Sequence, residues 1–441
     1  MRSFRGGIHL YEGKQLAADA PIVKVAAGRE LVLPLSQHIG APASPCVAVG
    51  DRVLRGQLIA EPTAFVSAGI CSPVSGTVKA IEVRPLLRGK GMVIVLENDG
   101  QNESVEGFGQ PRDYTSLSAE EIRSLVSAAG IVGMGGAGFP TAVKMAPKNA
   151  DAIRKVIINA AECEPYLTCD YRLLMERPEK VLGGLKVMLR LFPNAEGVLA
   201  VEDNKPQAIR LLKELVADEP KLSVKTLKTK YPQGGERLVL HVAANVDIDS
   251  TRLPADAGCV VQNVSTAVAV YDAVCASTPL ISRIVTLSGE AMTKPGNFEV
   301  PIGMPFADLL EVEGGFDLEV AKLIAGGPMT GTSFTDRQIP ITKTTGGFLA
   351  LSYDDVSENP TTACIRCGRC VSACPSGLVP QTLATLAARG EFDKFEQLYG
   401  VECVECGCCS YVCPAYRPLT QNMKLGKYNV IQNRRANAAK K

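Results

Sequence analysis

The sequence predicts a multidomain α/β protein that ends in a helical metal-binding region. Three observations support this fold class. The chain has 441 residues, which is too long for one ordinary hydrophobic core. Short β-branched segments alternate with amphipathic helical segments between residues 113 and 279. Cysteines of regular spacing gather after residue 355, where the composition changes.

Composition and charge exclude several classes of protein. Apolar residues make up 46% of the chain and charged residues 21%, as in ordinary folded proteins. The net charge is +1, tryptophan is absent and other aromatics are few, so we expect no nucleic-acid partner. No segment approaches the about 18 uninterrupted apolar residues that a membrane span needs. The first residues lack an apolar signal core, so we expect neither secretion nor a membrane span.

The N-terminal region, residues 1–112, is predicted to be a β domain. The segments 45–62 and 70–83 are short β-branched runs separated by Gly, Pro and Asp. Their pattern resembles the barrel-sandwich hybrid of biotinyl and lipoyl carriers. The intervening piece, "EPTAFVSAGI", has no lysine to carry a cofactor. We therefore expect a docking or structural module here.

Residues 113–279 are predicted to form a parallel α/β domain. Ser118 and Glu121 make a capping box for a first helix. Strands are expected at "KVIINA", "GVLAVE" and "LSVKTLKT", and helices at 173–192 and 204–217. This alternation predicts a parallel sheet with helices on both faces. Residues 280–354 return to β character and form a third predicted domain.

The fourth region, residues 355–441, contains two copies of the run C-x2-C-x2-C-x3-C-P and a short basic tail that we expect to be frayed. This is the bacterial ferredoxin pattern, in which the fourth cysteine binds the other cluster. The sequence therefore predicts two [4Fe-4S] clusters. One is assigned to Cys364, Cys367, Cys370 and Cys413, and the other to Cys403, Cys406, Cys409 and Cys374.

Other uses of the cysteines are less consistent with the spacing. Zinc favours two C-x2-C pairs and leaves no use for four cysteines in each run. Cys408 lies beside Cys409 and is interpreted as a bystander that could replace a neighbour. The remaining cysteines are interpreted as small buried side chains: Cys46, Cys71, Cys163, Cys169, Cys259 and Cys275.

A glycine-rich loop at residues 133–138, "GMGGAG", fits the dinucleotide string GxGxxG. A Rossmann loop must directly follow a strand, and here a capped helix precedes it. An acidic residue about 20 positions later is expected too, but that region is "NAAECEP". Four glycines within six residues suggest that the backbone closely approaches another group, and exposed amides suit phosphate.

Longer motifs carry a resemblance that covers nearly the whole chain. "GMGGAGFPTAVK", "NAAECEPYLTCDYRLL", "YPQGGERLV" and "VVQNVSTAVAV" resemble the flavin-binding core of the NADH-oxidising flavoprotein subunit of respiratory complex I. "SGEAMTKPGNFEVPIG" resembles a β-grasp (SLBB-like) domain. Together with "FRGGIH" and the ferredoxin runs, the chain is identified as a member of the RnfC family, which serves Rnf ion-translocating ferredoxin:NAD+ oxidoreductases.

The resemblance implies FMN and NAD(H) in addition to the two clusters. It also implies a peripheral position on the cytoplasmic face of the membrane. The expected partners are integral membrane subunits and a ferredoxin-accepting iron–sulfur subunit. In this family a flavin exchanges electron pairs with NAD(H) and single electrons with clusters. The implied enzyme is an NAD-linked ferredoxin oxidoreductase.

Residue roles follow from the same resemblance. Gly133, Gly135, Gly136 and Gly138 are expected to cradle FMN, with Lys144 at its phosphate and Asn159, Glu162 and Asn263 also in contact with the flavin. Phe139, Glu164 and Glu236 are expected near the nicotinamide nucleotide. Met134 and Ala161 replace the arginine and aspartate of complex I, which leaves the flavin's electronic environment open.

Each of these residues also has an ordinary structural interpretation. Lys144 could be solvated and Phe139 could belong to the core. Glu162 and Glu164 could cap the helix after Pro165, and Asn263 could stabilise a turn. Two other functions stay open. A diaphorase subunit would carry a single SCGxCxPC-type motif, which is absent here, and a non-enzymatic electron-transfer adapter would lack a working flavin pocket.

Overall fold

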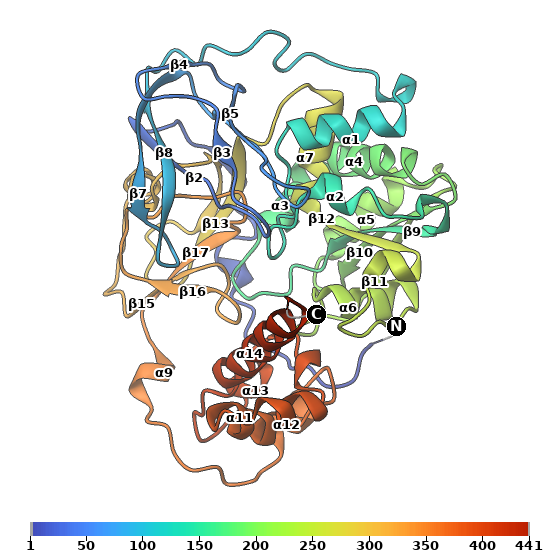
Figure 1. Cartoon of the computed structure of the whole chain (residues 1–441), viewed down its shortest axis with the longest axis vertical. Coiled ribbons are helices and arrows are strands. Elements are labelled where there is room, and N and C mark those ends of the chain that lie inside the picture. The colour runs from blue at the N-terminus through green and yellow to red at the C-terminus, as the bar shows by residue number, and fades with distance from the viewer. Residues whose placement is uncertain (1–2, 440–441) are drawn as a thin grey trace.

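The computed structural model describes residues 3–439 and shows four regions in the predicted order (Figure 1). The N-terminal β region and the α/β region lie side by side. The second β region lies below the first, and the C-terminal helices form a separate layer at the bottom of the view. This arrangement is the predicted multidomain α/β fold class.

The N-terminal β region consists of two small antiparallel sheets. One has the order β2 (Glu30–Pro34), β8 (Lys90–Asn98), β7 (Gly76–Pro85) and β4 (Arg52–Val53). The other has the order β3 (Ser44–Pro45), β5 (Leu58–Glu61) and β6 (Ile70–Cys71). Leu31, Leu33, Ile59 and Ile94 are fully buried within this region.

The β7–β8 hairpin extends beyond the strands that flank it. The two strands stay paired as far as Pro85 and Lys90. Their outer neighbours stop earlier, because β2 pairs with β8 only from Val93 onwards and β4 pairs only with the first two residues of β7. The far half of the hairpin is therefore a two-stranded ribbon with exposed edges.

The α/β region contains a four-stranded parallel sheet in the order β11 (Leu222–Leu227), β10 (Glu196–Glu202), β9 (Lys155–Ala160) and β12 (Cys259–Asn263). Alternate residues of β9 enter different cores. Val156 and Ile158 pack in the core that contains α4 (Pro178–Arg190) and α7 (Val264–Cys275). Ile157 packs with α6 (Glu236–Val239) and η4 (Leu240–Ala244). Both faces are covered, as predicted.

The first helix, α1 (Ala119–Ala128), begins at the predicted capping box of Ser118 and Glu121. The helix predicted over residues 173–192 is wrong as one element, because it is divided into α3 (Cys169–Glu176) and α4. Arg177 between them has a non-helical backbone, and Pro178 opens α4 because proline cannot donate an internal helix hydrogen bond. The helix α5 (Pro206–Leu215) forms close to its predicted range.

The second β region is a six-stranded mixed sheet in the order β1, β14, β13, β17, β15 and β16. Its bounds are β13 (Ser282–Ser288), β14 (Gly296–Pro301), β15 (Lys322–Ala325), β16 (Thr332–Phe334) and β17 (Gly347–Leu351). α8 (Phe306–Val312) packs against it. The edge strand β1 (Ile22–Lys24) comes from the start of the chain and pairs in parallel with β14.

The C-terminal layer contains α10 (Arg369–Ala373), α11 (Pro380–Ala388), α12 (Phe392–Gln397), α13 (Cys408–Tyr411) and α14 (Leu419–Ala439), after a short α9 (Asp355–Glu358). Phe395 and Met423 are buried in its core. The expectation of a frayed basic tail is wrong in part, because α14 continues to Ala439. Lys440 and Lys441 lie outside the described residues. No helix of the described residues is long and apolar enough to cross a membrane.

A segment at residues 4–10, here called the N-terminal strap, runs between the α/β region and the C-terminal layer. The Ile8 and Tyr231 backbones form an antiparallel bridge, and Lys230 Nζ donates to the Phe4 carbonyl at 3.0 Å. On the other side, Gly7 N donates to the Ala373 carbonyl at 2.9 Å. The strap therefore joins the parallel sheet's loops to the cysteine-bearing layer.

Candidate functional site

The order of the parallel strands places a ligand site at one edge of the sheet. From β9 the chain continues to β10 on one side and later returns to β12 on the other. Ligands of open α/β sheets bind at the carboxyl ends of strands at such a switch point. Asn159 of β9 and Asn263 of β12 are register partners at this position. Both side chains line a cavity of about 1140 Å³.

All four regions of the structure contribute walls to this cavity. The glycine loop lines it with Met134, Gly135, Gly136 and Ala137. The other walls include Gln37 and His38 of the N-terminal region, the loop 325–332 of the second β region and Val404–Cys406 of the C-terminal layer. Ligand pockets usually measure about 300–1,000 Å³, so this cavity is large enough for two ligands.

The glycine loop follows α1 and precedes α2 (Thr141–Lys144), so it is not the strand-to-helix turn of a Rossmann site. A Cβ on Gly136 would meet no atom within 4 Å, and one on Gly135 would meet the Asn263 side chain at 2.8 Å. Met134 N donates to Thr266 Oγ1 at 3.0 Å, which anchors the loop to α7. The anchored backbone leaves an open face where a phosphate or a flat ring fits.

The two asparagines are held in place by hydrogen bonds. Asn263 caps α7 by accepting from Ser265 N at 2.8 Å, and its Nδ2 donates to Asp170 Oδ2 at 2.6 Å. Asn159 Nδ2 donates to the Gly234 carbonyl at 2.8 Å. Asn263 is interpreted from the sequence as a possible turn residue, and in the structure it caps α7 and also lines the cavity.

The two glutamates of the "ECE" motif have different partners. Glu162 Oε1 accepts from Asp170 N at 2.7 Å and Oε2 accepts from Tyr171 N at 3.3 Å, so it caps α3 as one interpretation foresaw. Glu164 points to the second β region, where it accepts from Met329 N at 3.1 Å and Thr330 Oγ1 at 2.5 Å. Both residues line the cavity.

Burial raises the pKa of the Glu162 carboxyl to about 7, although the nearby Lys14 ammonium opposes this rise. Burial likewise raises the pKa of Glu164. Lys14 Nζ donates to the carbonyls of Glu164, at 2.9 Å, and Leu167. The half-buried Lys14 ammonium thus fixes the backbone between Glu164 and Leu167. With a pKa of about 7, the Glu162 carboxyl gains or loses a proton near neutral pH.

We expect the unfolding free energy of the flavin-free chain to fall as pH rises from about 4.5 to about 7. An unfolded glutamate loses its proton near its ordinary pKa of about 4.3, so the folded chain binds more protons in this window. Glu162→Gln should flatten this part of the pH dependence. Denaturant titrations at about pH 5 and about pH 7 measure the slope, with the exposed Glu179→Gln as control. An unchanged slope in Glu162→Gln would contradict this assignment.

Several residues expected at the flavin or nicotinamide do not line the cavity: Gly133, Gly138, Phe139, Lys144 and Glu236. Lys144 Nζ pairs with Glu236 at 2.6 Å, joining α2 to α6. Gly138 has a φ of +72°, and its backbone lies against His38 and Thr344. Gly133 N donates to the Phe139 carbonyl at 2.8 Å, which closes the glycine loop. These residues shape the loop and the neighbouring wall, and their roles toward a ligand stay predictions.

The structure adds residues that sequence reasoning missed. Gln37 is 5% exposed and lines the cavity, and its Nε2 has no hydrogen-bond partner within residues 3–439. An unpaired buried donor is costly unless a ligand accepts from it. Arg283, Thr344 and Thr345 also line the cavity. Nothing in the local sequence marks these residues, because they come from regions that lack the flavin motifs.

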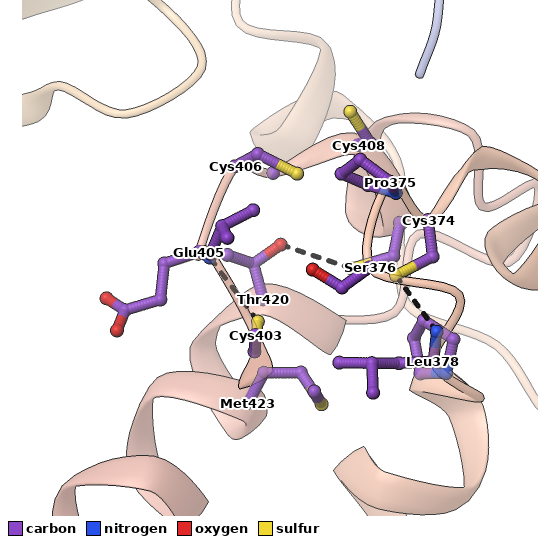
Figure 2. Close-up of a pocket in the computed structure, with 14 residues that line it drawn as sticks. Cys374, Pro375, Ser376, Leu378, Cys403, Glu405, Cys406, Cys408, Thr420 and Met423 are labelled. Carbon is purple, nitrogen blue, oxygen red and sulfur yellow. Dashed lines mark hydrogen bonds between the residues drawn. The ribbon is translucent and has the colours of Figure 1, made fainter. Parts of the chain in front are cut away.

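A second cavity in the C-terminal layer is lined by Cys374, Cys403, Cys406 and Cys409, together with Cys408. Figure 2 shows the sulfurs of Cys374, Cys403 and Cys406 around a common space. Leu378 N donates to Cys374 Sγ and Glu405 N to Cys403 Sγ, both at 3.4 Å. Amide donors to sulfur stabilise thiolates, as an iron–sulfur cluster requires. The structure thus brings together the four cysteines that were assigned to one cluster.

The four cysteines line one cavity, and the cluster that they would hold stays a prediction. Within residues 3–439, no group of three or more His, Cys, Asp or Glu side chains converges as closely as a single metal ion needs. A zinc ion holds its sulfurs at about 2.3 Å, whereas a cubane keeps its four thiolates further apart.

The other assigned cysteines lie toward the surface. Cys364 and Cys367 are exposed in the segment before α10, whereas Cys370 and Cys413 are half-buried. Cys408 is fully buried in contact with Tyr231 and Ala373. Of the six cysteines expected to be buried, Cys46 is exposed and Cys163 half-buried, so the expectation is wrong for Cys46. Cys46 lies at the end of the short edge strand β3, where no element covers it.

The two cavities meet at one short segment. Val404, Glu405 and Cys406 line both of them. Tyr231 OH donates to the Cys406 carbonyl at 2.7 Å and lies 3.5 Å from Glu164 Oε1. Because Tyr231 lines the large cavity and contacts the cysteine loop, it connects the nucleotide-sized space to the inner set of thiols.

Family models match the four regions in sequence. They are the RnfC barrel sandwich hybrid domain over residues 2–101, the Nuo51 FMN-binding domain over 126–272, the SLBB domain over 284–333 and the 4Fe-4S dicluster domain over 363–416. Fold and site together define an iron–sulfur flavoprotein related to the FMN-binding subunit of complex I.

Full-length relatives give a closer identification. The chain is 42% identical to the RnfC protein of the proton-translocating ferredoxin:NAD(+) oxidoreductase complex of Clostridium ljungdahlii, over 91% of this chain and 88% of that protein. It is 39% identical to the RnfC protein of the Na(+)-translocating complex of Acetobacterium woodii, over 98% of both. The chain belongs to the RnfC family of ion-translocating ferredoxin:NAD(+) oxidoreductase complexes.

A solved structure shows the same fold at lower identity. An NAD+-reducing [NiFe]-hydrogenase in its H2-reduced state matches with a TM-score of 0.50 and 19% identity. The match covers 73% of this chain and 62% of that chain. This match supports the fold described for the present chain.

Proposed function

We propose that this chain is the peripheral flavin and iron–sulfur subunit of an ion-translocating ferredoxin:NAD+ oxidoreductase, the Rnf complex. It binds FMN and two [4Fe-4S] clusters and passes electrons between them and NAD(H). Its partners are the other subunits of the complex, and its proposed place is the cytoplasmic face of the membrane. The boundaries after residues 112, 279 and 354 remain proposals.

The observation that carries this proposal is the segment Val404–Cys406, which lines both cavities. A flavin supplies the conversion between an electron pair and single electrons. The protein must place the flavin beside a cluster and keep the site partly closed to water. Cys406 lies in the wall between the two spaces, and Tyr231 holds the Cys406 carbonyl by a hydrogen bond.

The chain's own residues suit each part of this task. The open amides around Gly136 and the unpaired Gln37 Nε2 supply donors for a flavin phosphate and ring, with Asn159 and Asn263 on the cavity wall. The Glu164 side chain is the proposed neighbour of the nicotinamide. The exposed Cys364 and Cys367 give a partner access to the outer cluster.

Anaerobic purification of the full chain tests this function. We expect about eight irons, about eight sulfides and one FMN per chain, with absorbance that bleaches when NADH is added. Clusters without flavin, and absorbance indifferent to NADH, would favour the non-enzymatic adapter. Far fewer irons would contradict both functions.

A further inference from the structure

The tip of the β7–β8 hairpin lies over the large cavity, although it belongs to the N-terminal β region. Leu86, Leu87, Arg88, Lys90 and Gly91 all line this cavity. The tip reaches it because the far half of the hairpin extends past β2 and β4 as a free ribbon (Figure 1). Leu86 of the tip packs against Val32, Val93 and Val95 of its own region, whereas Leu87, Arg88 and Lys90 are exposed. The packing of Leu86 does not account for the exposed cations at the tip.

The Arg88 side chain joins the tip to the second β region by hydrogen bonds to one hydroxyl. Arg88 Nη2 and Nε donate to Thr332 Oγ1 at 3.0 and 3.3 Å. Thr330, two residues earlier, donates to Glu164. The turn of residues 327–332, closed by Gly331 N donating to the Gly327 carbonyl, therefore holds the hairpin tip at one end and Glu164 at the other.

The tip contributes two of the four cationic side chains that line the cavity. The lining carboxylates are Glu162, Glu164, Asp170 and Glu405, and the lining cations are Arg88, Lys90, Arg283 and Lys424. Arg283 is 3% exposed and engaged with the Thr345 carbonyl and Met134 Sδ. Lys424 comes from α14 on the cysteine side.

Arg88 and Lys90 are both exposed, and neither forms an ion pair within residues 3–439. Lys144, by contrast, is paired with Glu236 away from the cavity. Arg88 donates to one hydroxyl through Nε and Nη2. The remaining N–H groups of its guanidinium are free to bind another acceptor. Two unpaired cations beside a nucleotide-sized space suit the oxygens of a phosphate.

We propose that the hairpin tip is part of the pyridine-nucleotide site, where Arg88 and Lys90 bind the pyrophosphate of NAD(H). This inference rests on the proposed function. The glycine loop already offers amides for the FMN phosphate, so the hairpin cations serve the second ligand. Thr332 positions Arg88, and the same turn connects the pyrophosphate position to Glu164.

The test uses the full chain, purified anaerobically with its flavin and clusters. We expect the double variant Arg88→Gln, Lys90→Gln to bind NAD+ about 10- to 100-fold more weakly by calorimetry, because charged hydrogen bonds to phosphate are lost. FMN and iron contents should stay unchanged. The wild-type affinity should fall more steeply with added salt than that of the variant. Thr332→Val removes the hydroxyl that accepts from Arg88 and keeps both charges. Its NAD+ affinity should fall by about 2- to 10-fold.

A charge-matched control is Arg210→Gln with Lys213→Gln, since both residues are exposed on α5 and lie outside the cavity. The proposal would be overturned if this control lost as much NAD+ affinity as the hairpin variant. It would also be overturned if the hairpin variant kept its NAD+ affinity. A fall in FMN content with unchanged NAD+ affinity would assign the cations to the flavin phosphate. If the hairpin variant lost affinity for NADP+ but not for NAD+, the two cations would be assigned to the ribose phosphate of NADP+. If the wild-type chain bound no pyridine nucleotide, the proposed function itself would fail.

Discussion

Cys374→Ala is expected to lower the iron content of the chain from about eight to about four, because one cluster loses a ligand and the other keeps all of its own. Cys374 belongs to the first cysteine run in sequence, but it lines the cavity of the second run. The lost cluster should therefore be the one beside the large cavity. Iron and sulfide analysis measures the loss, and NADH-driven bleaching of the remaining cluster should slow sharply.

Cys408→Ala is the matched control, because Cys408 lines the same cavity but is not one of the four regularly spaced cysteines of the second run. We expect this variant to retain its iron. A reversed result, with iron lost on replacing Cys408 and kept on replacing Cys374, would show that Cys408 is the fourth ligand. Equal loss in both variants would indicate that the layer fails to fold, which circular dichroism can check.

Gly6→Ala is expected to destabilise the contact between the strap and the C-terminal layer by about 1–3 kcal/mol or more. Gly6 has a φ of +70°, and an added Cβ would overlap the Cys374 carbonyl. To relieve this overlap, either the backbone of the strap or the backbone near Cys374 must move. Since electron transfer falls steeply with distance, cluster reduction by NADH should slow even where the iron content is normal.

Stopped-flow absorbance and denaturant titration measure the two effects of Gly6→Ala. Gly100→Ala is the control, because Gly100 has a similar φ of +73° and nothing within 4 Å of the added Cβ. It carries the same backbone strain without the overlap. Indistinguishable reduction rates in the two variants would mean that the strap does not position the cluster.

The features that sequence predicted best are those encoded by neighbouring residues. Ferredoxin spacing specifies sulfur ligation within a few residues, and the structure places Cys374 with Cys403, Cys406 and Cys409. The capping box at Ser118 and the strand β9 are also local, and both are confirmed. Local hydrogen bonding and periodicity decide such elements before tertiary packing does.

The features that sequence missed depend on contacts between distant residues. Gln37 and Arg88 reach the cavity from the N-terminal region, and Tyr231 reaches the cysteine loop across the domain contact. No periodicity marks these side chains, because their neighbours are set by how whole regions pack. Lys144 matches a family motif and forms an ion pair with Glu236, and its expected role at the flavin phosphate stays a prediction. A motif gives the type of site, and packing decides which matching residues face it.

The course of the first residues has a consequence for biosynthesis. Residues 4–10 contact segments near 231 and 373, and residues 22–24 complete a sheet with residues 297–299. During translation the N-terminus leaves the ribosome long before these partners exist. The opening segment therefore stays unpaired until most of the polypeptide is made, although domains usually fold from the N-terminus as units. Its final docking follows the folding of the regions it joins.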